Sequence, residues 1–95
     1  MNIALVDDHQ LVRDGFKHLI ETQADLNVVI EANDYHQAVE LLSKLTVDLA
    51  IIDVSLPDVN GIELVRYCNE HYPDMKTLIV SMYDQPHYVN KALDA

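Results

Sequence analysis

Ile3-Ala4-Leu5-Val6-Asp7-Asp8 is a short apolar run that ends in two acidic residues, and Leu49-Ala50-Ile51-Ile52-Asp53 ends in a third. Apolar runs of this length, bounded by turn residues, are typical of buried strands. If the two strands are parallel neighbours, the three carboxylates gather at one edge of a sheet and repel one another. A cluster of this kind is stable when a cation neutralises it, or when raised pKa values keep part of it protonated. We therefore expect function at this edge.

Strand and helix patterns alternate along the rest of the chain. The predicted strands are 2–6, 27–32, 49–52 and 77–80. A first helix is predicted at 10–22, a second follows a capping box formed by Asp34 and Gln37, and a third is stopped by Pro73. Pro86 suits the first turn of a fourth helix that runs to the end of the chain. The apolar residues that recur at helical spacing are Leu11, Val12, Phe16, Leu19 and Ile20, then Ala38, Val39, Leu41, Leu42 and Leu45, then Ile62, Val65, Cys68 and Tyr72.

This alternation predicts an α/β fold, a doubly wound parallel sheet with helices on both faces. In the flavodoxin-like version of that fold, the first and third strands are neighbours and ligands bind beyond their carboxyl ends. We take the strand order 2-1-3-4 from this fold class. It brings Asp7, Asp8 and Asp53 to one crevice.

Composition restricts the possible partners. The 95 residues carry a formal net charge of −10 and only 6 Lys and Arg. This balance argues against direct binding of nucleic acid, which requires clustered basic residues, and suits a cation or a partner with a basic face. Cys68 is the only cysteine, and no apolar stretch approaches the length of a membrane span. We expect one cytoplasmic domain with no membrane partner.

Two longer motifs resemble a known family. Asp7-Asp8-His9-Gln10-Leu11-Val12-Arg13-Asp14-Gly15 and Asp53-Val54-Ser55-Leu56-Pro57-Asp58-Val59-Asn60-Gly61 are similar to the receiver domains of bacterial two-component response regulators. The Asp-Asp-His and Leu-Val-Arg-x-Gly sequence patterns resemble those of the NarL/FixJ subfamily in particular. The resemblance extends over the whole chain, and several spaced motifs in the right context are far more specific than one.

The resemblance implies a role for each matching residue. Asp53 would be the phosphoacceptor, taking a phosphoryl group from a histidine kinase. Asp8 and Asp53 would ligate Mg²⁺ directly, Asp7 would act on the metal through water, and the backbone carbonyl of Ser55 would be a further ligand. Ser81 would donate a hydrogen bond to the phosphoryl group. Mg²⁺ suits such a set because it prefers oxygen ligands and retains several waters.

The chain departs from the family pattern at its C-terminus. Receivers of this family continue into a fifth strand that ends in a lysine, and then a fifth helix, whereas this chain ends at Ala95. None of the four lysines present is expected to replace the missing one. We therefore expect residues 1–95 to be an incomplete receiver that phosphorylates more slowly than an intact one. The DNA-binding output domain that such regulators carry is not in this sequence.

Two alternative functions are weighed against the phosphoacceptor. A haloacid-dehalogenase-type phosphatase also uses an aspartate after a strand, but places a second aspartate two residues later, where this chain has Ser55. An interaction module that no longer phosphorylates would suit the absence of the lysine but not the three carboxylates. His9 beside two aspartates also suggests a transition-metal site. We favour Mg²⁺, because the five histidines include no pair at helical ligand spacing.

The absence of a fifth strand also predicts self-association. Without a fifth strand, the strand at 77–80 becomes an edge with unpaired backbone groups, and such edges recruit other chains. We expect a homo-oligomer that forms through this strand or through the fourth helix, with residues 83–86 as the hinge of any exchange.

Overall fold

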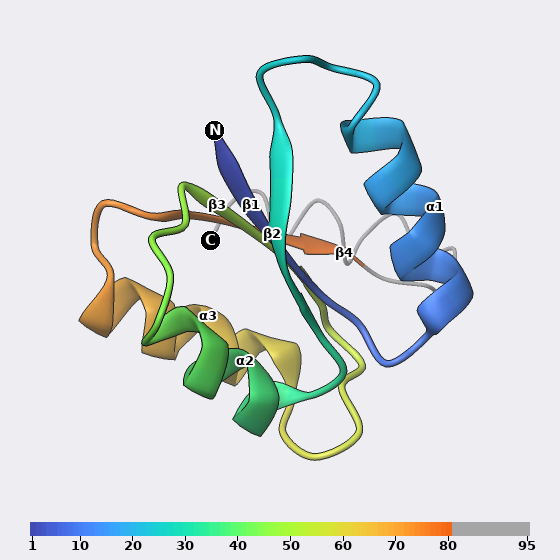
Figure 1. The fold of residues 1–95 in the computed structure, drawn as a ribbon. Helices are drawn as coiled ribbons and strands as arrows, with labels where there is room; N and C mark the ends of the chain where they lie inside the picture. Colours follow the sequence, from blue (N-terminus) through green and yellow to red (C-terminus); the bar gives the residue numbers. More distant parts are fainter. Residues whose placement is uncertain (81–95) are drawn as a thin grey trace.

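The computed structural model describes residues 1–80, and their elements alternate as predicted (Figure 1). Residues 81–95, which include Ser81, the 83–86 segment and the predicted fourth helix, lie outside the described part. Among the described residues, no helix is both long enough and apolar enough to span a bilayer. In chain order the elements are β1 (Asn2–Val6), α1 (Gln10–Ile20), β2 (Asn27–Ala32), α2 (Tyr35–Leu42), β3 (Leu49–Asp53), α3 (Gly61–His71) and β4 (Lys76–Val80).

The four strands form one parallel sheet in the order β2-β1-β3-β4, which confirms the predicted fold class and order. The register between the two central strands decides where the site lies. Leu5 pairs with Ile51 and Val6 pairs with Ile52, so Asp7 and Asp53 each follow directly on a paired position. The carboxyl ends of β1 and β3 therefore meet at the same edge of the sheet.

Helices cover both faces of this sheet: α2 and α3 lie on one face and α1 lies on the other (Figure 1). The larger core lies under α2 and α3, and the second core, under α1, contains three buried residues within the described part of the chain. The larger core comprises Ala4, Val6, Ile30, Ala32, Ala38, Leu42, Ala50, Ile52, Leu56, Leu64, Cys68 and Met75. The smaller one comprises Ile3, Leu5 and Ile51, with Phe16 and Ile20 packed against them.

The helix ends differ from prediction, and local hydrogen bonds account for the difference. α1 ends at Ile20, two residues early, and the Thr22 hydroxyl donates to the Leu19 carbonyl at 2.7 Å. α2 ends at Leu42, and the Ser43 hydroxyl donates to the Glu40 carbonyl at 2.6 Å. Short hydroxyl side chains satisfy terminal carbonyls in this way and compete with further helix.

Four residues assigned to apolar helix faces are instead exposed. Leu11, Leu19, Leu45 and Ile62 have exposed fractions of 87%, 66%, 46% and 45%. Leu45 lies beyond the end of α2, and in α3 the inward face is formed by Leu64 and Cys68, four residues apart. The strand limits also shift by one residue, because β3 includes Asp53 and β4 begins at Lys76.

The predicted capping box is present in a modified form. The Asp34 carboxylate accepts a hydrogen bond from the Gln37 backbone N–H at 2.8 Å. The Gln37 side chain accepts from the Asn33 N–H at 2.7 Å, one residue before the position that a standard box uses. The start of α2 is thus fixed from both sides.

Candidate functional site

Four side chains converge at the carboxyl ends of β1 and β3. Asp7, Asp8, His9 and Asp53 each offer one ligand atom, and these atoms all lie within 4.8 Å of one another. The structure thus brings together the three carboxylates that the sequence analysis selected. It adds His9, whose ring the sequence did not place in the cluster.

Asp53 is fully buried, which is unusual for a carboxylate. Its Oδ1 accepts a hydrogen bond from the Ser55 backbone N–H at 3.0 Å, while its Oδ2 has no hydrogen-bond partner. Burial raises the pKa of Asp53, and the charges of Asp7 and Asp8 raise it further. The Ser55 N–H and the His9 ring act in the opposite direction. The buried Oδ2 can therefore accept a proton, bind a cation or attack an electrophile.

Asp7 is buried beside it, and Asp8 is more exposed. Asp7 Oδ1 accepts from the His9 backbone N–H at 2.8 Å, but Asp7 Oδ2 is buried without a partner. The Asp8 side chain is 34% exposed. The cluster therefore contains two deeply buried acids and one acid that reaches solvent, with two buried carboxylate oxygens left unsatisfied.

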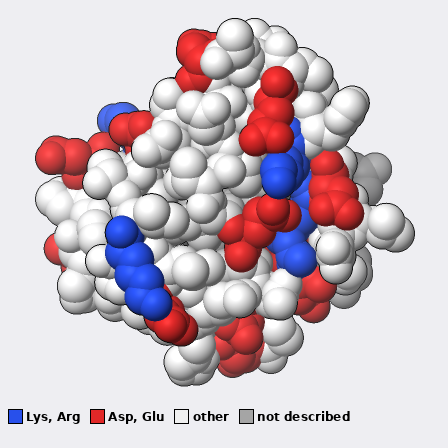
Figure 2. All heavy atoms as spheres, in the orientation of Figure 1, with Lys and Arg blue, Asp and Glu red and all other residues white. Residues whose placement is uncertain are grey.

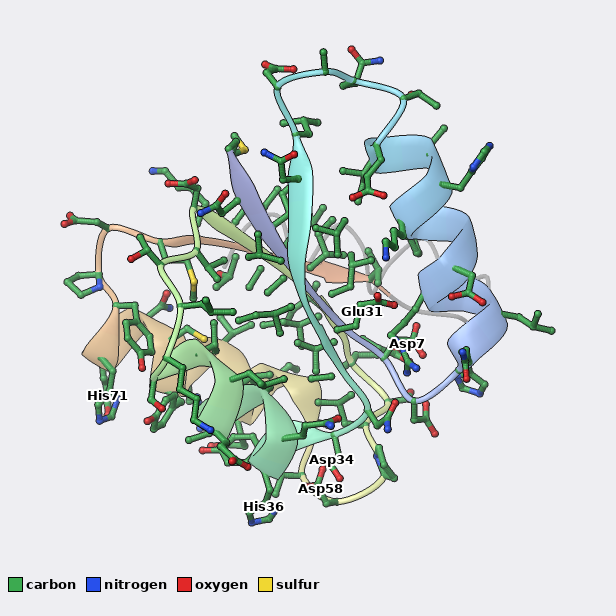
Figure 3. All side chains as sticks on the ribbon, in the orientation of Figure 1. Asp7, Glu31, Asp34, His36, Asp58 and His71 are labelled. Atoms are coloured by element: carbon green, nitrogen blue, oxygen red, sulfur yellow. The ribbon has the colours of Figure 1, made fainter. Side chains whose placement is uncertain are left out.

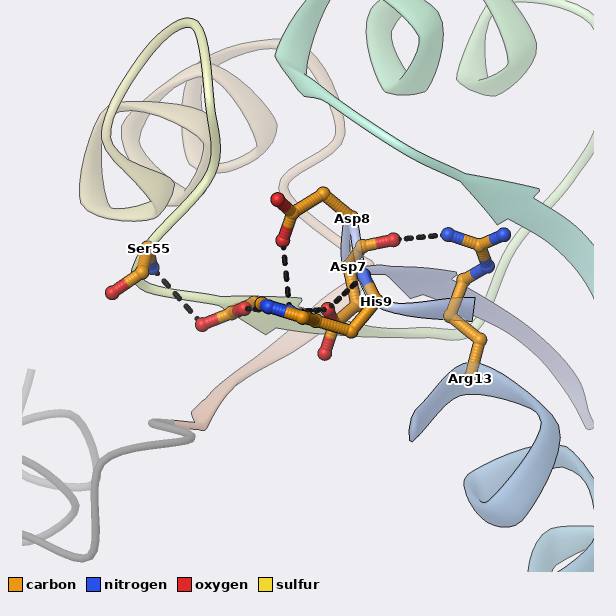
Figure 4. A network of polar contacts seen from close by, with 6 residues as sticks. Asp7, Asp8, His9, Arg13 and Ser55 are labelled. Carbon is orange, nitrogen blue, oxygen red and sulfur yellow. Dashed lines mark hydrogen bonds and ion pairs between the residues drawn. The ribbon is translucent and has the colours of Figure 1, made fainter. Parts of the chain in front are cut away.

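The His9 ring lies among the carboxylates of the cluster (Figure 4). Its Nδ1 is 3.0 Å from Asp7 Oδ1, 3.0 Å from Asp8 Oδ1 and 4.0 Å from Asp53 Oδ2. The hydrogen bond with Asp7, assisted by the charge of Asp8, raises the pKa of His9. Adjacency to Asp8 in the sequence was the available signal, although it gave no direction for the ring.

Arg13 is a residue to which the sequence analysis assigned no role. It is the one buried residue of α1, and its Nη1 donates to the backbone carbonyl of Asp7 (Figure 4). Its Nε lies 3.8 Å from a carboxylate oxygen of Glu31, at the end of β2. The guanidinium thus joins α1 to the ends of β1 and β2 directly behind the acidic cluster. An arginine three residues before the inward-facing Phe16 was the available signal.

The loop between β3 and α3 is fixed by two further residues. Asp58 accepts from the Tyr35 and His36 backbone N–H groups at 3.0 and 3.2 Å, and its Oδ2 lies 2.6 Å from His36 Nδ1. Figure 3 shows Asp58 and His36 side by side at the start of α2. Gly61, at the other end of the loop, lies so close to β3 that an added Cβ would be 2.2 Å from the Asp53 carbonyl oxygen.

The other predicted site residues are placed as follows. Ser55 is exposed and its backbone N–H binds Asp53, which leaves its predicted carbonyl–metal contact a prediction. Ser81 lies outside the described residues, so its predicted role also stays a prediction.

The face seen in Figure 2 shows acidic side chains flanking the basic ones, and Lys17 Nζ lies 3.4 Å from Glu31. That face presents no uninterrupted basic patch.

The donor set fits a hard divalent cation. Unpaired buried carboxylate oxygens are costly, and a cation is the group that satisfies several of them together. Asp7 Oδ2 and Asp53 Oδ2 are in this condition, and Asp8 supplies a third, partly exposed carboxylate. A cation with retained waters, as Mg²⁺ binds, is compatible with this set.

Comparisons with known proteins place the chain in a family. The family model of the response regulator receiver domain matches residues 3–95. The chain is 38% identical to the transcriptional regulatory protein DegU of Brevibacillus brevis over 93 residues, covering 98% of this chain and 39% of DegU. It is similar to the non-phosphorylated receiver domain of the stress response regulator RcsB from Escherichia coli, with a TM-score of 0.86, 32% identity and coverage of 99% and 74%.

A further solved structure was determined with both DNA and a phosphate mimic. The chain is similar to RcsB from Salmonella enterica serovar Typhimurium bound to promoter rprA in the presence of the phosphomimetic BeF₃⁻. The TM-score is 0.85 at 32% identity, and the match covers 99% of this chain and 79% of that one. The chain thus spans well under half of DegU but most of this RcsB chain.

Proposed function

Because the chain belongs to the response regulator receiver domain family of two-component systems, we propose that it accepts a phosphoryl group on Asp53 from a phosphohistidine of a histidine kinase. One observation carries the proposal. Asp53 is fully buried at the carboxyl edge of the sheet, beside Asp7 and Asp8, with its Oδ2 unpaired. The fold leaves one oxygen of this buried carboxylate without a hydrogen bond, and buried acids of this kind are candidates for functional sites.

Mg²⁺ is the proposed cofactor. Asp8 and Asp53 would hold it directly, Asp7 would bind it through water, and the Ser55 carbonyl would complete the protein ligands. When bound, the cation would neutralise negative charge on the carboxylates and on the incoming phosphoryl group. Binding is expected to be weak, because most of the Mg²⁺ shell stays water.

The protein's own groups position the nucleophile. A carboxylate oxygen of Asp53 attacks phosphorus, a P–O bond forms, the P–N bond of the phosphohistidine breaks, and the imidazole leaves and takes up a proton. The Ser55 N–H holds Oδ1 and so fixes the carboxylate plane. Arg13 fixes the backbone that carries Asp7 and Asp8, and Gly61 lets α3 lie against β3 behind Asp53. Ser81 would donate to the transferred group.

The wider role follows the relatives. DegU is a transcriptional regulator, and RcsB was solved on promoter DNA. We propose that this receiver, acting in the cytoplasm, controls DNA binding through a separate output domain. It would be a phosphoacceptor that slowly loses its phosphoryl group, not a turnover enzyme.

The test is intact-mass spectrometry after treatment of the chain with acetyl phosphate and Mg²⁺. We expect one phosphoryl adduct that EDTA prevents and Asp53→Asn abolishes, while the matched variant Asp48→Asn, at the opposite end of β3, keeps it. An adduct that survives in Asp53→Asn would overturn the site. Mg²⁺ binding with no adduct would favour the interaction module, and sustained release of phosphate from a generic phosphoester would favour the phosphatase.

Self-association is a second part of the proposal. Within residues 1–80, β4 pairs only with β3, so one side of Lys76–Val80 carries no strand partner in the described part of the chain. RcsB was solved as dimers bound to DNA, and we propose that this chain also pairs with a second copy, through that strand. Light scattering should give a dimer or larger species, which a Leu78→Pro change in β4 dissociates; a stable monomer at high concentration would contradict this.

A further inference from the structure

His9 is placed as a ligand would be. Its Nδ1 is directed into the acidic cluster, at 3.0 Å from Asp7 Oδ1 and from Asp8 Oδ1 (Figure 4). The side chain is 56% exposed, so the opposite ring nitrogen, Nε2, can carry its proton toward solvent. That tautomer leaves the Nδ1 lone pair pointing at the carboxylates.

The separations match the shell of a small divalent ion. Such ions bind imidazole nitrogen and carboxylate oxygen at about 2.0–2.2 Å, so adjacent octahedral ligands lie about 3 Å apart and opposite ones about 4.2 Å apart. Nδ1 is 3.0 Å from Asp7 and Asp8, and 4.0 Å from Asp53 Oδ2. His9 therefore has the spacing of a ligand adjacent to Asp8 and opposite Asp53, the two carboxylates proposed to bind the ion directly.

A second observation points to a ligand independently of this spacing. Asp53 is 0% exposed and Asp7 is 4% exposed, yet each has an Oδ2 with no hydrogen-bond partner. An imidazolium at the position of His9 pairs with Asp7 Oδ1 and Asp8 Oδ1 but leaves both of these oxygens unsatisfied. A metal ion among the four groups can satisfy oxygens that the histidine proton does not reach.

We propose that His9 supplies a nitrogen ligand, through Nδ1, to the divalent cation at this site, and that the site therefore binds a first-row transition ion such as Mn²⁺ more tightly than Mg²⁺. The inference rests on the proposed function, whose cation site it shares. Mg²⁺ gains little from a nitrogen donor, because it prefers oxygen and retains its waters. Imidazole is a good ligand for transition ions, so one His among carboxylates changes the preference of the site.

The experiment uses Mn²⁺ alone as the probe on the whole 95-residue chain. Electron paramagnetic resonance gives the affinity, and pulsed measurements detect a nitrogen nucleus directly bonded to the ion. We expect a histidine ¹⁴N coupling that changes to the ¹⁵N pattern when only histidine is labelled. This readout does not depend on any variant. Addition of Mg²⁺ should displace Mn²⁺, which establishes that the two ions share the site.

Variants then assign the nitrogen. His9→Gln should remove the coupling and weaken Mn²⁺ binding by a larger factor than Mg²⁺ binding, which should change less than about threefold. His18→Gln, in the last turn of α1, is the matched control and should change neither. Circular dichroism checks that both variants are folded.

The outcomes separate this inference from the proposed function. Mn²⁺ bound at the shared site without nitrogen coupling, or coupling that survives in His9→Gln, would overturn the role of His9 and leave the phosphoacceptor proposal standing. If neither Mn²⁺ nor Mg²⁺ binds, the cation site itself is wrong, and both proposals fall.

Discussion

Gly61 and Gly15 are the two glycines of the chain, and alanine should have opposite effects at the two positions. Both lie in helices and neither has positive φ. At Gly15 an added Cβ would meet nothing within 4 Å. At Gly61 it would lie 2.2 Å from the Asp53 carbonyl oxygen and 2.9 Å from both the Asp53 carbonyl carbon and the Val54 Cα. These contacts are with backbone, so rotation of a side chain cannot relieve them.

The magnitudes follow from these distances. An ordinary contact is about 3.5 Å, so α3 and the end of β3 would have to separate by roughly 1.3 Å, given the 2.2 Å contact. Overpacking of this kind costs about 1–3 kcal/mol, against a helix-propensity gain of up to about 1 kcal/mol. Gly61→Ala should therefore lower the free energy of unfolding by about 1–2 kcal/mol. Gly15→Ala should raise it by about 0.5–1 kcal/mol.

Urea denaturation of the two variants and the wild-type chain measures this difference. Because the displaced atom is the Asp53 carbonyl, Gly61→Ala should also weaken Mg²⁺ binding, whereas Gly15→Ala should not. If Gly61→Ala were as stable as Gly15→Ala, with unchanged Mg²⁺ affinity, the close packing of α3 on β3 would have no energetic meaning and our account of that contact would be wrong.

Three further predictions concern charged side chains that the fold holds in place. Asp53→Asn should raise the free energy of unfolding at pH 7 without Mg²⁺. The pKa of Asp53 is raised in the fold, so wild-type stability falls as the pH rises from the ordinary pKa of an aspartate through the raised pKa of Asp53. Thermal unfolding that shows a loss of stability in the variant would refute this. Arg13→Met should cost about 1–3 kcal/mol by leaving the Asp7 carbonyl unpaired, while the exposed Arg66→Met should change stability by less than about 1 kcal/mol in the same urea assay. Burial raises the pKa of Asp58, but its bonds to Tyr35, His36 and Val59 outweigh burial and hold the pKa well below its usual range. The stability that Asp58 supplies should therefore be present above about pH 4 and be lost as pH falls further, and acid titration of Asp58→Asn should lack that loss.

The sequence predicted the sheet because its strands are nearly continuous apolar runs separated by strong turn residues. Strand order came from the fold class, and the observed register then placed Asp7 beside Asp53. Helix ends were less predictable. Residues such as Ser43 and Thr22 decide them through local hydrogen bonds that apolar spacing does not reveal. Ile62 shows the same limit, because apolar spacing alone does not say which leucine or isoleucine faces the core.

The carboxylates of the site were predictable because strand ends carry them to one edge whatever their side chains contact. The supporting residues were not. The positions of His9, Arg13 and Asp58 depend on side-chain direction and on neighbours far along the chain, such as Glu31 for Arg13 and Tyr35 for Asp58. Burial of a charged residue within a helix is visible only when the elements around it are packed.

The central claim is that the buried Asp53 is the phosphoacceptor of a cation-dependent site. Tandem mass spectrometry that locates the phosphoryl group on the wild-type chain, after acetyl phosphate with and without Mg²⁺, tests it most directly. We predict modification of the peptide that contains Asp53, at that residue alone and only with Mg²⁺. A phosphoryl group on Asp7, Asp8 or His9, or modification of Asp53 that is equally fast in EDTA, would contradict the account.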